Sequence, residues 1–216
     1  MSREMHGFYP DYNVLDHADQ WDELTREIVL QRLNPPVVLS HLNAWEQKMI
    51  AKISEHLVYD DRGEIMAWIV SYFDTQLAAD IGESERKPDT PPQNQLIRDG
   101  LRAFDHWARM ISGQGFLENG TQIQFQILSQ LQLGSLPVFD QWQASLQKSL
   151  FTKLAGMVIK AYYSHPTVWS EIGYGGPAYP RGYVRIELGL ADPWEAKSEE
   201  GCNGKPGSGE ASLRPL

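Results

Sequence analysis

The sequence has one cysteine and no long hydrophobic run. A single cysteine, Cys202, excludes an internal disulfide and any metal site built from several cysteines, so we interpret it as a spare surface thiol. No segment approaches the roughly 20 apolar residues of a membrane-spanning helix, and we expect none. The first residues, Met1 to Tyr12, lack the cationic and apolar regions of a secretory signal. The chain as written is therefore expected in the cytoplasm, or in the periplasm if a partner exports it or a signal has been removed.

Clusters of positive charge are also missing. The 19 Lys and Arg residues are outnumbered by 28 Asp and Glu residues, which gives a formal net charge of −9 and a pI near 5.1. Nucleic acids and anionic lipids both require clustered Lys and Arg, so we exclude them as partners. At 216 residues and 42% hydrophobic, the chain can still bury one ordinary core.

The patterns of the common catalytic, cofactor and metal sites are absent as well. The histidines are dispersed, with no pair three or four residues apart and no Glu-x-x-His repeat. There is no Walker loop, no Gly-x-Ser-x-Gly turn and no Cys/His nucleophile pair. Residues 173–178 spell the Gly-x-Gly-x-x-Ala dinucleotide fingerprint, but that fingerprint must follow a strand, and a predicted helix precedes it here. We predict no catalytic residues, no cofactor and no metal in this chain.

What the sequence does contain is apolar residues at helical spacing. Five such stripes run through residues 42–57, 65–77, 97–111, 123–131 and 151–162. Asn43 and Glu46 form a capping-box pattern before the first stripe. Gly82 and Gly113 are expected to end the second and third helices, and the last helix is expected to end before Pro166.

A shorter helix is predicted over residues 21–33, and alternation of period two is limited to residues 183–187. The fold class is therefore all-α: an irregular bundle of about five core helices with a Gly/Tyr/Pro-rich C-terminal loop region and extended termini. We divide the chain into an N-terminal arm (1–38), a helical domain (39–195) and a flexible or partner-bound tail (196–216).

The loop region after the last stripe is unusual in composition. Its glycines lose much backbone freedom on folding, so an ordered loop needs a compensating gain. Tyr174, Tyr179 and Tyr183 can supply one, because tyrosine offers a large apolar face with few rotatable bonds. Pro177 and Pro180 restrict the unfolded loop. We interpret this region as a rigid contact surface.

Two motifs at this end of the chain resemble a known family. They are His165-Pro-x-x-Trp-x-x-Ile-Gly-Tyr-Gly-Gly-Pro-x-Tyr-Pro-x-Gly-Tyr183 and Asp192-Pro-Trp-Glu195, and they are similar to the C-terminal region of the gluconate 2-dehydrogenase subunit 3 family. The resemblance covers approximately residues 39–195. It implies a small, non-catalytic subunit beside a large FAD-dependent dehydrogenase of the glucose-methanol-choline type, with the FAD in that partner. A cytochrome c subunit or another electron acceptor would be a further partner.

The resemblance points to a set of candidate partner-binding residues: His165, Trp169, Tyr174, Gly175, Gly176, Pro177, Tyr179, Pro180, Tyr183, Asp192 and Trp194. For His165 a helix-end role is the favoured alternative, and for the two tryptophans a core role is equally compatible. We expect Tyr179→Ala or Trp169→Ala to weaken a complex while leaving the helices intact. Gly175→Val is expected to be harmful if that residue has a positive φ.

Three functions fit these residues. The first is an accessory subunit that binds and stabilises a dehydrogenase of sugars, glycosides or sugar acids. The second is a stand-alone ligand-binding domain or small enzyme with a pocket at the Tyr-Gly loop. The third is a chaperone or export escort that leaves its client after folding.

Overall fold

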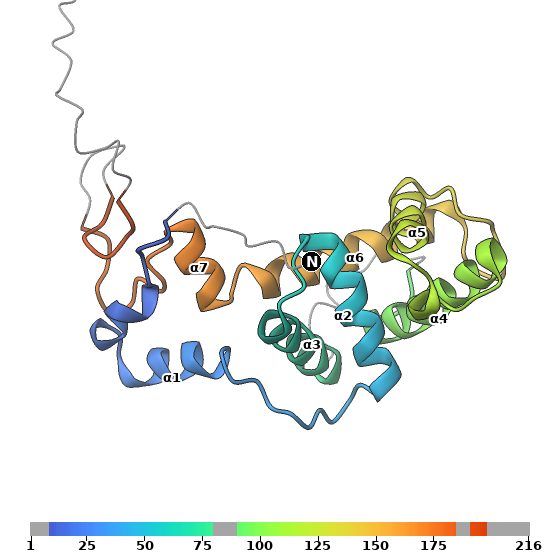
Figure 1. The fold of residues 1–216 in the computed structure, drawn as a ribbon. Helices are drawn as coiled ribbons and strands as arrows, with labels where there is room; N and C mark the ends of the chain where they lie inside the picture. The colour runs from blue at the N-terminus through green and yellow to red at the C-terminus, as the bar shows by residue number, and fades with distance from the viewer. Residues whose placement is uncertain (1–8, 80–89, 185–190, 198–216) are drawn as a thin grey trace, which may run out of the picture. The chain divides into compact units, whose positions relative to one another are not determined.

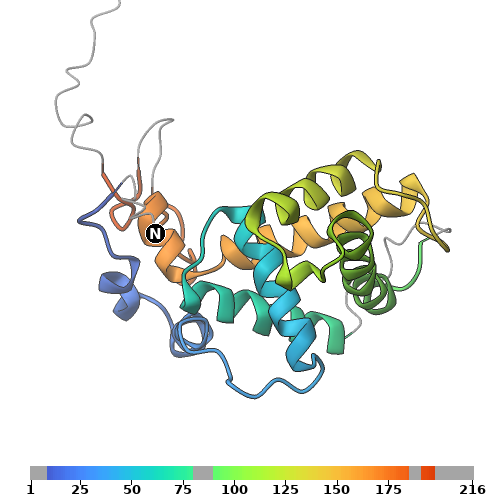
Figure 2. The same ribbon diagram turned by 45° about the vertical axis from the view of Figure 1, so that its right-hand side comes forward.

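The computed structural model describes residues 9–79, 90–184 and 191–197 (Figures 1 and 2). All regular secondary structure in these residues is helical, which confirms the predicted all-α class. The predicted alternating segment at 183–187 lies mostly outside the described residues.

The chain forms two compact units. One contains residues 27–79 and 90–165 and is called the helical unit here. The other combines residues 9–26 with residues 166–184 and 191–197, and is called the terminal unit because it joins segments from both ends of the chain. The predicted arm, helical domain and tail, with boundaries at residues 38 and 195, stay predictions.

The helical unit contains the five predicted stripes as helices. They are α2 (Ala44–Val58), α3 (Gly63–Ala78), α4 (Gln93–Ser112), α5 (Thr121–Leu133) and α6 (Ala144–Tyr162), with a short 3-10 helix η3 (Phe116–Glu118) before α5. Helix α6 packs against each of the other four long helices (Figures 1 and 2). The predicted ends are confirmed at Gly113, which adopts a φ of 79°, and before Pro166. Helix α3 ends at Ala78, and Gly82 lies outside the described residues.

The helix predicted over residues 21–33 is shorter in the structure. It is α1 (Glu23–Gln31), and it contains the position at which the two units divide. The Asp22 carboxylate accepts a bond of 3.1 Å from the Thr25 backbone N–H, so the side chain of Asp22 satisfies a free donor of the first turn. Trp21 therefore precedes α1, and it is buried.

Aromatic side chains fill the part of the core between α4 and the segment that leads into α6. Trp107 is fully buried, with its ring centroid 5.4 Å from Phe139, 5.6 Å from Trp142 and 6.3 Å from Phe104. Its indole N–H donates to the Pro137 carbonyl over 2.9 Å, which satisfies its polar atom. A buried aromatic cluster of this kind fixes α4 relative to the chain entering α6.

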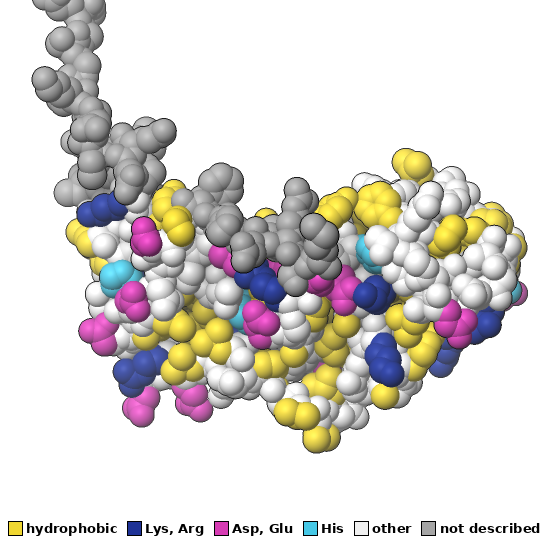
Figure 3. All heavy atoms as spheres, viewed as in Figure 1, with side chains coloured by type: hydrophobic (Ala, Val, Ile, Leu, Met, Phe, Trp, Pro, Cys, Tyr) yellow, Lys and Arg dark blue, Asp and Glu magenta, His cyan; other side chains and the backbone are white. Residues whose placement is uncertain are grey.

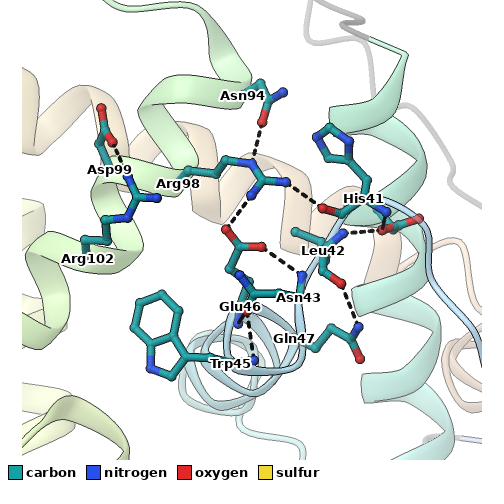
Figure 4. A network of polar contacts seen from close by, with 11 residues as sticks. His41, Leu42, Asn43, Trp45, Glu46, Gln47, Asn94, Arg98, Asp99 and Arg102 are labelled. Carbon is teal, nitrogen blue, oxygen red and sulfur yellow. Dashed lines mark hydrogen bonds and ion pairs between the residues drawn. The ribbon is translucent and has the colours of Figure 1, made fainter.

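A polar network joins α4 to the start of α2 (Figure 4). The predicted capping box is confirmed: Asn43 accepts from the backbone N–H of Glu46, and the Glu46 carboxylate accepts from the backbone N–H of Asn43. Arg98 of α4 then donates to the Glu46 carboxylate over 2.7 Å and to the His41 carbonyl over 2.6 Å. Because Glu46 is buried, this ion pair compensates a charge that would otherwise be costly.

The chain entering α2 is held by a carboxylate of α3. Asp74 is buried, and it accepts bonds from the backbone N–H groups of Ser40 (3.2 Å), His41 (2.8 Å) and Leu42 (2.7 Å). Burial alone would raise the pKa of the Asp74 carboxyl. The backbone bonds from Leu42, His41 and Ser40 outweigh burial and hold that pKa below its usual value.

Candidate partner-binding surface

The terminal unit is built on a short 3-10 helix from the N-terminal segment and a short α-helix from the C-terminal segment. The first is η1 (Val14–Gln20), which begins where the Asn13 side chain accepts from the Leu15 backbone N–H over 3.1 Å. The second is α7 (Pro166–Ile172). The Val14 backbone N–H donates to the Ser170 hydroxyl over 3.1 Å, and Val14 is fully buried. The two segments therefore fold as one unit although more than a hundred residues separate them.

The Gly/Tyr/Pro loop follows α7 and is organised around Arg181. One guanidinium nitrogen, Nη2, donates to the carbonyls of Gly175 (2.6 Å) and Pro177 (2.9 Å). These two bonds fold the loop back onto itself. Because the acceptors are backbone atoms, the loop depends on the cation at position 181 rather than on the side chains at positions 175 and 177.

Two tryptophans enclose the same guanidinium. Its central carbon lies 4.5 Å from the Trp194 ring centroid and 5.7 Å from the Trp21 ring centroid. Trp21 follows η1, and Trp194 belongs to the segment 191–197, so Arg181 joins the loop to both neighbouring segments by cation–π contacts. Burial lowers the pKa of the Arg181 guanidinium, and the nearby groups of Tyr12, Tyr174 and Asp192 oppose that shift. A guanidinium stays protonated in proteins, so the cation is permanent.

Further bonds fix the segment 191–197 against the loop and the N-terminal segment. The Tyr12 hydroxyl donates to the Trp194 carbonyl over 2.6 Å, and the Asp192 carboxylate accepts from the Val184 backbone N–H over 2.8 Å. Burial raises the pKa of Tyr12 to about 12, partly offset by Arg181. Tyr12 therefore keeps its proton, and its bond to Trp194, throughout the physiological range.

The comparison with protein families matches a model described as gluconate 2-dehydrogenase subunit 3 to residues 44–176. The chain belongs to the gluconate 2-dehydrogenase subunit 3 family. The matched region runs from the start of α2 through α7 to Gly176, so it includes the first glycines of the loop and ends before Arg181 and Asp192. No curated protein and no solved structure matches the chain. The resemblance seen in the sequence is thereby confirmed at the level of the family.

The candidate partner-binding residues fall into two groups in the structure, one exposed and the other buried or half-buried. Tyr174, Tyr179 and Tyr183 are 43%, 68% and 73% exposed, and Pro180 is also exposed. The remaining candidates are buried or half-buried: His165, Trp169, Gly175, Gly176, Pro177, Asp192 and Trp194. We call the exposed residues Tyr174, Tyr179, Pro180 and Tyr183 the tyrosine surface, because only they offer a partner large contact areas.

Two candidates have specific structural positions. Trp169 lies in α7, which the sequence reasoning did not predict, and its ring packs edge-on against Tyr174 with centroids 5.4 Å apart. Since Trp169 is 5% exposed, Trp169→Ala is expected to destabilise the terminal unit rather than remove a partner contact. His165 is fully buried in the helical unit, at the turn after α6, where its backbone N–H donates to the Tyr162 carbonyl.

Arg181 is the residue that sequence reasoning missed. The signal available in the sequence was a single arginine inside a loop of Gly, Pro and Tyr, with one tryptophan 13 residues later at position 194 and another far away at position 21. Among the described residues, no group of three or more His, Cys, Asp or Glu side chains is placed to hold a metal ion. In the same part of the chain, no helix combines the length and hydrophobicity needed to cross a bilayer.

Glycine is required in this loop by close packing at Gly175 and by backbone conformation at Gly176. A Cβ on Gly175 would lie 2.6 Å from Cδ1 of Trp194, and the positive φ considered for Gly175 occurs instead at Gly176, where φ is 78°. We predict that Gly175→Val destabilises the terminal unit by about 1–3 kcal/mol, because the added atoms overpack the Trp194 contact. Thermal unfolding followed by tryptophan fluorescence measures the effect.

The matched control is Gly156→Ala in α6, where an added Cβ meets open space. Alanine is the better helix former by up to about 1 kcal/mol, so this variant should unfold at the same or a higher temperature than the wild type. Equal melting curves for Gly175→Val and the control would contradict the packing argument.

Proposed function

We propose that this chain is a non-catalytic accessory subunit that binds and stabilises a large FAD-dependent dehydrogenase of the glucose-methanol-choline type. That enzyme would oxidise sugars, glycosides or sugar acids. The family is, by its description, a subunit of gluconate 2-dehydrogenase, and membership in it supports a role beside a dehydrogenase. The FAD, the oxidised substrate and the route to an electron acceptor such as a cytochrome c subunit would all belong to the partners.

The observation that carries the proposal is a rigid aromatic surface on a supporting scaffold. Tyr179 and Tyr183 expose most of their side chains, although the loop that presents them is held by Arg181 and packed tryptophans. Exposed tyrosines on a pre-organised loop lose little conformational entropy when a partner covers them. If this chain binds the dehydrogenase only in its folded state, binding shifts the folding equilibrium of the dehydrogenase toward that state by mass action.

The stand-alone ligand-binding alternative places a pocket at the Tyr-Gly loop. A cavity of about 460 Å³ in the described structure lies elsewhere, in the helical unit, between α4 and residues 139–142. It is lined by Asp99, Arg102, Ala103, His106, Phe139, Asp140, Gln141 and Trp142. None of these belongs to the loop, so the cavity gives the alternative no support at its predicted position.

Co-expression with a candidate flavin-dependent dehydrogenase from the same organism tests the proposal. We expect the two chains to purify together through gel filtration, and the dehydrogenase to be less soluble and less active when expressed alone. A dehydrogenase that is equally soluble and active without this chain would overturn the proposal. A complex that forms during folding but separates on gel filtration would instead indicate a transient chaperone.

The double variant Tyr179→Ala, Tyr183→Ala tests the surface within that complex. Loss of two central aromatic contacts is expected to weaken binding by about 2 kcal/mol or more, roughly thirtyfold or more in Kd, with unchanged helical circular dichroism. Biolayer interferometry measures Kd.

The matched control is Tyr59→Asn in the helical unit, where the tyrosine is also 68% exposed and has a φ of 54° that asparagine tolerates well. Its Kd should equal that of the wild type. Equal binding by the double variant and the control would place the interface elsewhere.

A further inference from the structure

Among the residues that the structure describes, the net negative charge is concentrated in the terminal unit. The described residues of the helical unit contain eleven carboxylate side chains and ten Lys or Arg side chains, so their charges nearly cancel. The terminal unit has eight carboxylate residues in its described part, namely Asp11, Asp16, Asp19, Asp22, Glu23, Glu171, Asp192 and Glu195. It has three cationic residues there, Arg26, Arg181 and Lys197. The unit that presents the tyrosine surface is therefore strongly acidic.

The local arrangement increases this asymmetry. In the helical unit, ion pairs neutralise carboxylates at Glu46, Asp60, Asp99 and Asp105. In the terminal unit, the Arg181 guanidinium points into the fold, where it binds backbone carbonyls and tryptophan rings and lies near the buried Asp192, so it leaves the exposed carboxylates of the unit uncompensated by its charge. Figure 3 shows Asp and Glu side chains exposed on the face that it presents.

Two exposed acidic residues directly precede side chains that contact the loop or the segment 191–197. Asp19 is exposed and precedes Gln20, whose side-chain oxygen is 3.4 Å from a guanidinium nitrogen of Arg181. Asp11 is exposed and precedes Tyr12, whose hydroxyl donates to the Trp194 carbonyl. The terminal unit thus combines exposed aromatic faces with exposed carboxylates, two of which adjoin residues that contact Arg181 or Trp194.

Aromatic faces and carboxylates both attract cations, and arginine is the side chain that uses both. Its planar guanidinium stacks on aromatic rings and donates two parallel bonds to a carboxylate. The terminal unit already shows the aromatic part of this chemistry internally, at Arg181 between Trp21 and Trp194.

We propose that the tyrosine surface and its neighbouring carboxylates dock onto a basic, arginine-rich surface of the dehydrogenase partner. This inference rests on the proposed function and adds the chemical nature of the partner surface. It distinguishes the interface from an apolar one, because attraction between opposite charges is screened by salt while apolar burial is not.

The first test measures Kd for the purified dehydrogenase subunit in 0.05 M and 0.5 M NaCl. We expect binding at least tenfold weaker at the higher salt concentration. The double variant Asp11→Lys, Asp19→Lys is expected to bind at least tenfold more weakly than the wild type at low salt and to lose most of the salt dependence. The control Asp61→Lys reverses an exposed charge of the helical unit and should leave Kd within about twofold.

A second test separates the contribution of the aromatic ring of Tyr179 to binding from that of apolar burial alone. Tyr179→Phe keeps the ring and should leave Kd within about threefold, while Tyr179→Leu keeps apolar bulk without a ring and should weaken binding at least fivefold. Equal Kd values for the Phe and Leu variants would contradict the cation–π part of the proposal.

The outcomes separate this inference from the proposed function. A complex whose affinity changes little with salt or with the charge reversals overturns the basic docking surface and leaves the accessory-subunit role intact. If no complex forms even at low salt, both are overturned. A third outcome is that salt weakens binding, but Asp61→Lys weakens it as strongly as the double variant Asp11→Lys, Asp19→Lys does. That result would show a general effect of net charge and would overturn the assignment to the tyrosine surface.

Discussion

Replacing Arg181 by alanine is expected to remove both the order of the tyrosine surface and the binding of a partner. The variant loses two charge-assisted bonds, to the carbonyls of Gly175 and Pro177, and two cation–π contacts, to Trp21 and Trp194. A charge-assisted bond contributes about 1.5–3 kcal/mol and a cation–π contact about 0.5–2 kcal/mol. Because the four contacts share one side chain, their contributions do not add, and we expect destabilisation of the terminal unit on the order of 2–4 kcal/mol. Limited proteolysis, with cleavage mapped by mass spectrometry, should show rapid cutting within residues 173–197.

Arg181→Lys should fail to restore the wild-type behaviour. A lysine ammonium can bind one of the two carbonyls, but it lacks the planar group that lies between the indole rings. The control Arg102→Ala removes an exposed ion pair with Asp99 in the helical unit and should change stability by less than about 0.5 kcal/mol. Wild-type protease resistance and partner binding in Arg181→Ala would show that the loop is ordered by other contacts.

Asp74→Ala should destabilise the helical unit by about 3 kcal/mol or more. The substitution leaves the backbone N–H groups of Ser40, His41 and Leu42 without their acceptor. The bond to Leu42 is buried and the other two are partly buried; an orphaned buried donor costs about 1–3 kcal/mol, and the two partly buried donors add to that cost. Urea unfolding at pH 7 measures the free energy of unfolding. The exposed Asp61→Ala serves as the control, and similar midpoints for the two variants would contradict the role given to Asp74.

The same carboxylate makes stability depend on pH. The pKa of Asp74 is lower in the folded chain than in the unfolded chain, where it lies near 3.9, so ionised Asp74 stabilises the folded state. This contribution is complete above the unfolded pKa and is lost as the pH falls through the folded pKa. The wild type should therefore lose more stability below about pH 4 than Asp74→Asn does, because the amide does not titrate. Parallel pH profiles would indicate that other carboxylates control acid unfolding.

The core helices could be predicted because their signal is local. Each stripe from α2 to α6 repeats apolar residues every three or four positions, and most of these residues form the core. The capping box at Asn43 and the glycine end at Gly113 are also decided within one turn of helix. Helix α7 was missed because Pro166 was interpreted only as the end of α6. Proline also suits the first turn of a helix, because the N–H groups there have no acceptor within the helix and the missing N–H of proline costs no hydrogen bond.

The organisation of the loop could not be predicted because its contacts follow no regular spacing in the sequence, unlike those of a helix. Composition indicated that something must compensate for ordering the glycines, but it did not show that Arg181 binds the carbonyls at positions 175 and 177. Spacing likewise gave no sign that Trp21 and Trp194 enclose the same guanidinium. It also left open whether Trp169 was a core or a surface residue, which the burial of its ring in α7 decides.

The construction of the terminal unit from both ends of the chain sets an order of events during synthesis. Tyr12 and its acceptor, the Trp194 carbonyl, are 182 residues apart, so the N-terminal segment must wait until that residue has left the ribosome. At about 5–20 residues per second, this wait lasts on the order of 10–40 s. A chain truncated before Trp194 lacks one side of the Arg181 enclosure, so an incomplete translation product cannot present the finished tyrosine surface.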